Sequence, residues 1–199
     1  MRKMALRVAV TTAAMGAALG LTVASASATT QGAWTVSPGG SFTAHAVNPT
    51  LDVPSAQLIC DSADATGSIA TSDADGINIG SIGNIAFNTC SVGGLDFDVT
   101  MTATPWNLSV TGVNSGNANW VDGRVSGISA HIEGPLCTAD FAGTVYGHYE
   151  NDTHALVIDG TGVDLVASNA DCLGLISDDD VAQFNASFAV SPGMTITPA

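Results

Sequence analysis

The sequence predicts an all-β protein, an antiparallel sandwich or barrel built from many short strands. Two observations carry this prediction. Apolar and polar residues alternate along several segments, and turn-forming residues separate those segments at short intervals. Helix signals are almost absent. The one candidate is 177–183, where a serine can cap a single helical turn; a loop leading into the next strand explains this segment equally well.

The firmest strand prediction is the segment 95–101. Its apolar residues occupy every second position and are separated by acidic and hydroxyl residues. A period of two places the apolar side chains on one face of a strand and the polar ones on the other. Similar alternation predicts further strands at 106–111, 141–150 and 184–190, and apolar pairs suggest two more at 77–79 and 85–87.

Predicted turns separate these strands. Gly, Pro, Asn and Asp cluster between the apolar runs, and each of them favours tight turns for its own stereochemical reason. The clearest predicted turns are 37–40, 73–76, 93–94, 114–117 and 122–123.

The N-terminal segment 1–28 has the features of a secretory signal peptide. Three basic residues lie within the first seven positions, an uncharged apolar stretch follows, and small residues occupy 24–28. Signal peptidase recognises this order, so we expect cleavage after Ala28 or Ala26 and a secreted, extracellular protein. The apolar stretch is short for a membrane span, which takes about 20 residues. We therefore expect no membrane span.

The expected secreted chain is strongly acidic. The whole sequence has 4 basic and 18 acidic residues. Removal of 1–28 leaves Arg124 as the one basic residue against all 18 acidic ones, a net charge of −17. Such a charge repels nucleic acid and anionic lipid and favours cations or a basic partner.

The four cysteines predict two disulfides, because an even number in an exported chain usually pairs. We favour Cys60–Cys90 and Cys137–Cys172 among the three pairings, since each bridge then lies in one half of the chain. A zinc site is the rival, but no two cysteines have close spacing and no histidine lies near them.

Residues 29–199 are expected to form a single domain, a length that suits one hydrophobic core. Two internal sequence similarities raise the hypothesis of related halves, about 29–115 and 116–199. The clearer similarity is between 34–39, Trp-Thr-Val-Ser-Pro-Gly, and 188–193, Phe-Ala-Val-Ser-Pro-Gly. Turns and edge strands that require similar residues would explain these similarities equally well.

Several short motifs resemble those of a group of small, Streptomyces-like actinobacterial secreted proteins of unassigned function. The likeness covers most of 29–199 and implies export and β structure, without catalytic residues. Its motifs are the Trp34 start, the region after Cys60, Ile-Ala-Phe-Asn-Thr-Cys at 85–90, Thr-Pro-Trp-Asn-Leu at 104–108, Gly-Pro-Leu-Cys at 134–137 and Val-Ser-Pro at 190–192.

Two histidine–carboxylate pairs are candidates for metal binding or acid–base chemistry. His131 with Glu133, and His148 with Glu150, are each two residues apart and so share one face of a strand. Asp96 and Asp98 form a carboxylate pair of the same kind. A solvated outer sheet surface is the simpler explanation for all three pairs.

Calcium is a further candidate ligand, since clustered carboxylates beside turns supply the oxygen atoms that it prefers. The candidate carboxylates are Asp73, Asp75, Asp178 and Asp180. Neither cluster matches an EF-hand loop, and aspartates that cap their own turns are the alternative.

Trp120 lies after an Asn-rich turn, which makes it a candidate for ligand contact, with core packing as the alternative. No catalytic triad or nucleophile motif is recognisable. We therefore expect a non-catalytic binding or surface-associated protein. A hydrolase with a site built from distant loops and a structural envelope or matrix component are the alternatives.

The structure offers a way to choose among these classes. A large apolar cavity inside the sheet would favour a carrier of a lipid or small molecule, whereas a flat exposed apolar strip would favour assembly. A pocket that holds His131 or His148 beside a carboxylate would favour an enzyme.

Overall fold

The computed structural model describes residues 32–160 and 165–199. The predicted signal peptide, 1–28, lies outside the described residues. The described chain is all β, as predicted, and contains no helix that is long and apolar enough to cross a membrane.

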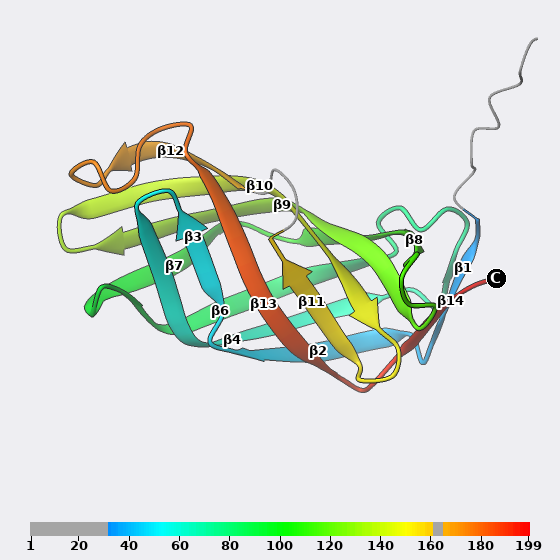
Figure 1. Cartoon of the computed structure of the whole chain (residues 1–199). Helices are drawn as coiled ribbons and strands as arrows, with labels where there is room; N and C mark the ends of the chain where they lie inside the picture. The colour runs from blue at the N-terminus through cyan, green and yellow to red at the C-terminus, as the bar shows by residue number, and fades with distance from the viewer. Residues whose placement is uncertain (1–31, 161–164) are drawn as a thin grey trace, which may run out of the picture.

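The strands differ widely in length, and the longest ones run most of the length of the molecule (Figure 1). In chain order they are β1 (Trp34–Ser37), β2 (Gly40–Val47), β3 (Thr50–Val53), β4 (Ala56–Ile69), β5 (Ser72–Asp73), β6 (Gly80–Val92), β7 (Leu95–Ala103), β8 (Trp106–Val113), β9 (Trp120–Gly134), β10 (Cys137–Glu150), β11 (Ala155–Asp159), β12 (Leu165–Asp171), β13 (Val181–Ser191) and β14 (Thr195–Pro198).

The main sheet closes into an antiparallel barrel with eight strand positions. Five positions are filled by the single strands β4, β6, β9, β10 and β13. Three positions are each shared by two shorter strands, which lie end to end between the same neighbours: β2 with β3, β7 with β8, and β11 with β12. The sequence left a sandwich and a barrel open, and the closed pairing establishes the barrel.

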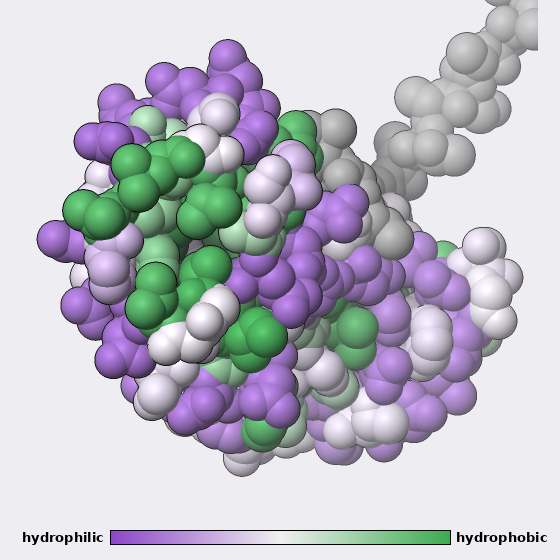
Figure 2. Space-filling view, turned by 60° about the vertical axis from the view of Figure 1, so that its left-hand side comes forward, coloured by the Kyte–Doolittle hydropathy of each residue, from purple (hydrophilic) through white to green (hydrophobic). Residues whose placement is uncertain are grey.

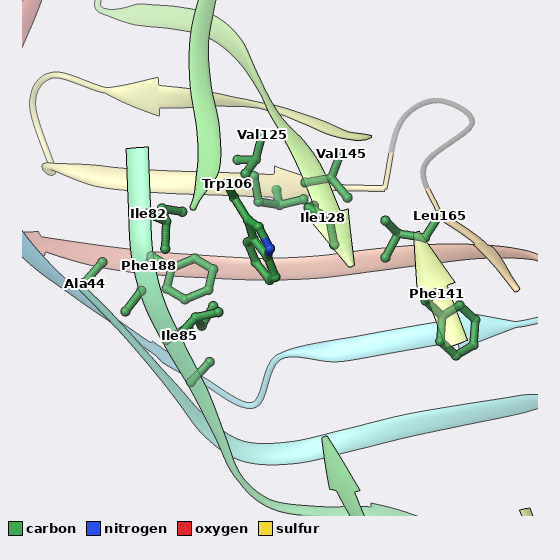
Figure 3. Packing of buried hydrophobic residues seen from close by; sticks show 14 of the residues in the cluster. Ala44, Ile82, Ile85, Trp106, Val125, Ile128, Phe141, Val145, Leu165 and Phe188 are labelled. Atoms are coloured by element: carbon green, nitrogen blue, oxygen red, sulfur yellow. The ribbon is translucent and has the colours of Figure 1, made fainter. Parts of the chain in front are cut away.

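Alternate side chains of each strand fill the barrel interior. Figure 3 shows Trp106 pointing toward the middle of this core, with Ile82, Ile85 and Phe188 near it. On β10, Phe141 and Val145 are almost completely buried. The apolar alternation predicted for 106–111, 141–150, 184–190 and 85–87 falls on β8, β10, β13 and β6, so these strand predictions are confirmed.

A small second sheet covers one end of the barrel, which we call the closed end. Strand β1 lies between β14 and β5 in this sheet. Trp34 on β1 is 4% exposed. The hydroxyl of Tyr149 on β10 donates to the carbonyl of Met194 (3.0 Å) and accepts from its amide (3.1 Å). The segment leading into β14 is thereby fixed to the barrel wall.

The opposite end, which we call the mouth, has no covering sheet among the described residues. It is formed by the β3–β4, β6–β7 and β9–β10 turns and by the loop 172–180, which follows β12. In Figure 1 the mouth lies at the left and the closed end at the right.

Both predicted disulfides are present, and both lie near the mouth. Cys60 and Cys90 are directly opposite each other on β4 and β6, a few residues from the β6–β7 turn. Cys137 is the first residue of β10, and Cys172 follows the last residue of β12. The bridges therefore join strands at the mouth, the end that no sheet covers among residues 32–160 and 165–199.

Three local predictions are wrong. Residues 122–123 are not a turn but lie within β9. A Cβ at Gly123 would lie 2.7 Å from the carbonyl oxygen of Ser109, so glycine is needed here because β8 approaches closely. Residues 77–79 are not a strand, since Asp73 and Asp75 bind the amides of Gly76 and Ile77 and hold this segment in turns.

The third wrong prediction concerns Leu95, which alternation assigned to the buried face of its strand. It is 55% exposed, because it begins β7 at the mouth, where none of the described elements lies over it. Phe97, two residues further on, is buried as predicted. In the segment 177–183, residues 177–180 form a loop and residues 181–183 begin β13, so the alternative to a helical turn is confirmed.

Candidate functional site

An apolar cavity of about 70 Å³ lies inside the mouth half of the barrel. Its wall is apolar almost throughout and combines residues of most barrel strands, among them Leu51, Leu58, Val99, Ala130, Phe141 and Phe184. Among the described residues of this lining, Thr50 is the one with a hydroxyl group, and that hydroxyl is turned to the carboxylate of Asp52 (3.2 Å). The cavity therefore presents almost no hydrogen-bonding group to an occupant.

A second cavity of about 70 Å³ lies in the closed half of the barrel. The two cavities share four lining residues, Phe42, Val125, Leu156 and Ile158. They therefore follow one another along the barrel axis. The second cavity ends at Tyr149, Met194 and Ile196, beneath the sheet that covers the closed end.

Exposed leucines surround the mouth. Leu136 and Leu173 are each 77% exposed, and Leu95 and Leu175 are 55% and 46% exposed. Leu95 starts β7, Leu136 lies in the β9–β10 turn, and the other two lie in the loop after β12. Figure 2, which brings the mouth forward, shows apolar residues gathered around a hollow. The apolar lining of the barrel thus continues outward onto an apolar rim.

Carboxylates lie next to these leucines. Asp96 follows Leu95, Glu133 is three residues before Leu136, and Asp171 is two residues before Leu173; all three are exposed. The one Lys or Arg in the described ranges is Arg124, which lies in the first half of β9, toward the closed end. The mouth is therefore an apolar ring with an acidic surround.

Trp120 lies at the closed end of the barrel and does not line either cavity. Its ring stacks on the imidazole of His148, with a centroid distance of 4.2 Å. His148 in turn lies 3.4 Å from a carboxylate oxygen of Glu150, and both side chains are mostly buried. The predicted His148–Glu150 pair is formed. Ligand contact by Trp120 stays a prediction.

His131 pairs with a carboxylate other than the predicted Glu133. Its Nδ1 lies 2.6 Å from Oδ1 of Asp140 on the neighbouring strand β10, and Asn169 on β12 donates to the second oxygen of Asp140 (2.8 Å). The hydrogen bond from His131, and next that from Asn169, lowers the pKa of Asp140. This row lies on the outer wall and does not line the cavities.

The calcium-candidate aspartates cap backbone amides. Asp73 accepts from the amides of Asp75 and Gly76, and these bonds lower its pKa. Asp178 accepts from Ala170, and Asp180 accepts from Ser177. Asp96 and Asp98 are both exposed on β7. Within 32–160 and 165–199 no three His, Cys, Asp or Glu residues converge as a metal site, and calcium binding stays a prediction.

The sequence did not point to the cavity or to the leucine rim. Alternation identified inward residues, but an unfilled volume depends on how large side chains from eight strand positions meet. A signal for the rim was present in Pro-Leu-Cys at 135–137 and Cys-Leu-Gly-Leu at 172–175. There, large apolar residues occupy segments that form turns.

Comparisons with known proteins add no relative. No protein-family model, no curated protein and no solved structure matches the chain. The resemblance to small actinobacterial secreted proteins therefore stays a prediction.

Proposed function

We propose that this is a secreted, non-catalytic binding protein that takes a slender apolar ligand, such as a single alkyl chain, through the mouth into the barrel. The observation that carries the proposal is the apolar cavity inside the mouth half, surrounded by an apolar rim. Pockets of this kind, apolar and inside a barrel, are common sites for small ligands.

The chemistry of the cavity limits the buried part of the ligand. A cavity needs only about 10–15 Å³ to hold one water molecule, but water also needs polar partners, and apolar cavities stay dry. The volume of about 70 Å³ is therefore better filled by hydrocarbon than by water. Any polar group on the ligand would lack a partner inside and belongs at the mouth.

The charge of the mouth limits the head group of the ligand. Asp96, Glu133 and Asp171 surround the opening, and Arg124 is toward the opposite end. A carboxylate head would meet like charges, whereas a hydroxyl or ammonium head would not. We therefore expect alkyl alcohols and alkyl amines to bind more tightly than alkyl carboxylates of equal length.

The positions of the histidine pairs support binding without catalysis. His131 with Asp140, and His148 with Glu150, do not line the cavity in which the ligand would lie. An acid–base group must come within hydrogen-bond reach of the reacting atoms. Neither pair meets this requirement for a ligand inside the barrel.

The test is a titration in solution with 1-decanol, decylamine and decanoate below their aggregation concentrations. Trp106 lines the cavity, so its fluorescence should change on binding, and a Trp106→Phe variant should lose most of that change. Ala130→Phe fills the cavity and should weaken decanol binding at least tenfold. Ala86→Phe, on the exposed face of β6, is the matched control and should bind as the native protein does.

Two results would reject the proposal. One is the absence of binding for all three compounds, measured by fluorescence and by native mass spectrometry. The other is equal weakening by Ala130→Phe and Ala86→Phe, which would mean that the response does not come from the cavity.

A further inference from the structure

We infer that the mouth docks on a neutral lipid surface, where its exposed leucines insert and bring the opening of the barrel against the lipid. This inference rests on the proposed function, because it states where the apolar ligand is collected or delivered.

The two most exposed leucines occupy backbone conformations that leucine disfavours. Leu136 has φ of 59° and Leu173 has φ of 50°, in the left-handed region that glycine and asparagine adopt more easily. Burial does not offset the cost of this conformation for either side chain, since each is 77% exposed. Folding alone does not explain leucine at either position, which points to a contact outside the protein.

One disulfide holds this pair of leucines together. Leu136 directly precedes Cys137 and Leu173 directly follows Cys172, and these two cysteines form a bridge. The two side chains are thus presented from turns whose separation is fixed covalently. A contact surface that is fixed beforehand loses less conformational entropy when it binds.

The leucines are arranged as a ring and not as a strip. Leu95 begins β7, Leu136 lies in the β9–β10 turn, and Leu173 and Leu175 lie in the loop after β12, so three separate segments bring leucines to one opening. Figure 2 shows the apolar residues on more than one side of the hollow. A planar lipid surface contacts such protruding tips together, and the opening in their middle then faces hydrocarbon. Clustered exposed apolar residues of this kind mark interaction sites.

The negative charge around the mouth favours a neutral lipid surface over other apolar partners. Asp96, Glu133 and Asp171 flank the leucines. An anionic bilayer would be repelled by these carboxylates. A second copy docked mouth to mouth would bring the same acidic surrounds together and would also be repelled. A neutral or zwitterionic surface accepts the leucines without either penalty.

The experiment is flotation of the protein with phosphatidylcholine vesicles and with phosphatidylglycerol vesicles. The key variant is Leu136→Asn with Leu173→Asn, because asparagine tolerates positive φ and should fold at least as well. The matched control removes two exposed apolar side chains from the barrel wall, by Val47→Thr with Val166→Thr. Thermal melting of every variant checks that each one folds.

We expect binding to phosphatidylcholine that is at least tenfold stronger than binding to phosphatidylglycerol. The double asparagine variant should lose phosphatidylcholine binding at least tenfold, and the wall control should keep it. Failure of the native protein to float with phosphatidylcholine would overturn the inference, as would undiminished flotation of the asparagine variant. A dimer seen by light scattering and abolished by the asparagine substitutions would assign the mouth to a second copy instead.

The two proposals fail separately. The asparagine variant should still bind decanol in solution, whereas Ala130→Phe should lose decanol and still float with phosphatidylcholine. A native protein that binds decanol but no vesicle would leave the proposed function standing and remove the docking inference. One that binds vesicles but no decanol would do the reverse.

Discussion

The two ends of the barrel use apolar residues in opposite ways. At the closed end, Trp34 belongs to the covering three-stranded sheet and is 4% exposed, and Tyr149 is hydrogen-bonded to the segment that leads into β14. At the mouth, Leu136 and Leu173 are exposed, and two disulfides join the strands. Packing stabilises one end and covalent bridges the other, which leaves the apolar side chains of the mouth free to contact a partner.

The two ends should differ most in how much stability is lost when one large apolar side chain is truncated at each end. Trp34→Ala should lower the free energy of unfolding by about 3–5 kcal/mol, because it leaves a cavity in the core. Leu136→Ala should change it by no more than about 0.5 kcal/mol, as expected for an exposed site. Urea unfolding of both variants measures this difference. Equal losses at the two sites would show that the mouth is packed as tightly as the closed end.

Removal of a disulfide should loosen the mouth alone. The bridges span sequence separations of 30 and 35 residues. Loops of that length are worth roughly 3–4 kcal/mol in the chain-entropy model. Replacing Cys137 and Cys172 with alanine should therefore lower the free energy of unfolding by about that amount.

Hydrogen exchange locates the effect of that substitution. Amides near the β9–β10 turn and in the loop 172–180 should exchange faster, and those of β1 and β14 should be unchanged. Faster exchange at both ends would contradict the view that the bridges act on the mouth.

Loss of the Tyr149 hydrogen bonds at the closed end should lower the free energy of unfolding moderately. Tyr149→Phe removes a buried hydroxyl that bonds both the amide and the carbonyl of Met194. A buried polar group that is left without its hydrogen-bond partner costs about 1–3 kcal/mol. Tyr149→Phe should therefore lower the free energy of unfolding by about that amount. Tyr146→Phe, on the partly exposed outer wall of β10, is the control and should stay within about 0.5 kcal/mol. A loss for Tyr146→Phe as large as that for Tyr149→Phe would contradict this assignment.

The sequence predicted the repeating part of this fold and missed its ends. Alternation identified β6, β7, β8, β10 and β13 but not the long strands β4 and β9, and the even number of cysteines, each pair in one half, identified the bridges. These features depend on local period or on simple counting. Leu95 fits the same alternation as Phe97, yet it is exposed, because burial depends on whether another element covers that end of the strand.

The candidate site was less accessible to sequence reasoning for a related reason. His131 was paired with Glu133 on its own strand, whereas the structure pairs it with Asp140 on the next strand. Cross-strand neighbours depend on register, which a bulge between Gly143 and Thr144 shifts further along the same pair of strands. The cavity needs the same knowledge of register from every strand position.

The smallest expected effect is electrostatic and lies on the wall below the mouth. His131 on β9, Asp140 on β10 and Asn169 on β12 form a polar row across three neighbouring strands, and the Cys137–Cys172 bridge joins β10 to the end of β12. The hydrogen bonds of this row lower the pKa of Asp140 below its ordinary value of 3.8. A depressed pKa means that the ionised carboxylate stabilises the folded state above pH 3.8, and that this stabilisation is lost as the pH falls through the folded-state pKa.

Carboxyl NMR titration of Asp140 measures this effect directly. His131→Ala should raise the pKa of Asp140 more than Asn169→Ala does, because the bond from His131 is the larger cause of the shift. The effect on unfolding should be small, since both side chains of the His131–Asp140 pair are about one-third exposed to solvent. An unchanged Asp140 pKa in His131→Ala would show that the side-chain contact between His131 and Asp140 does not couple β9 to β10, and that the backbone ladder alone joins these two strands.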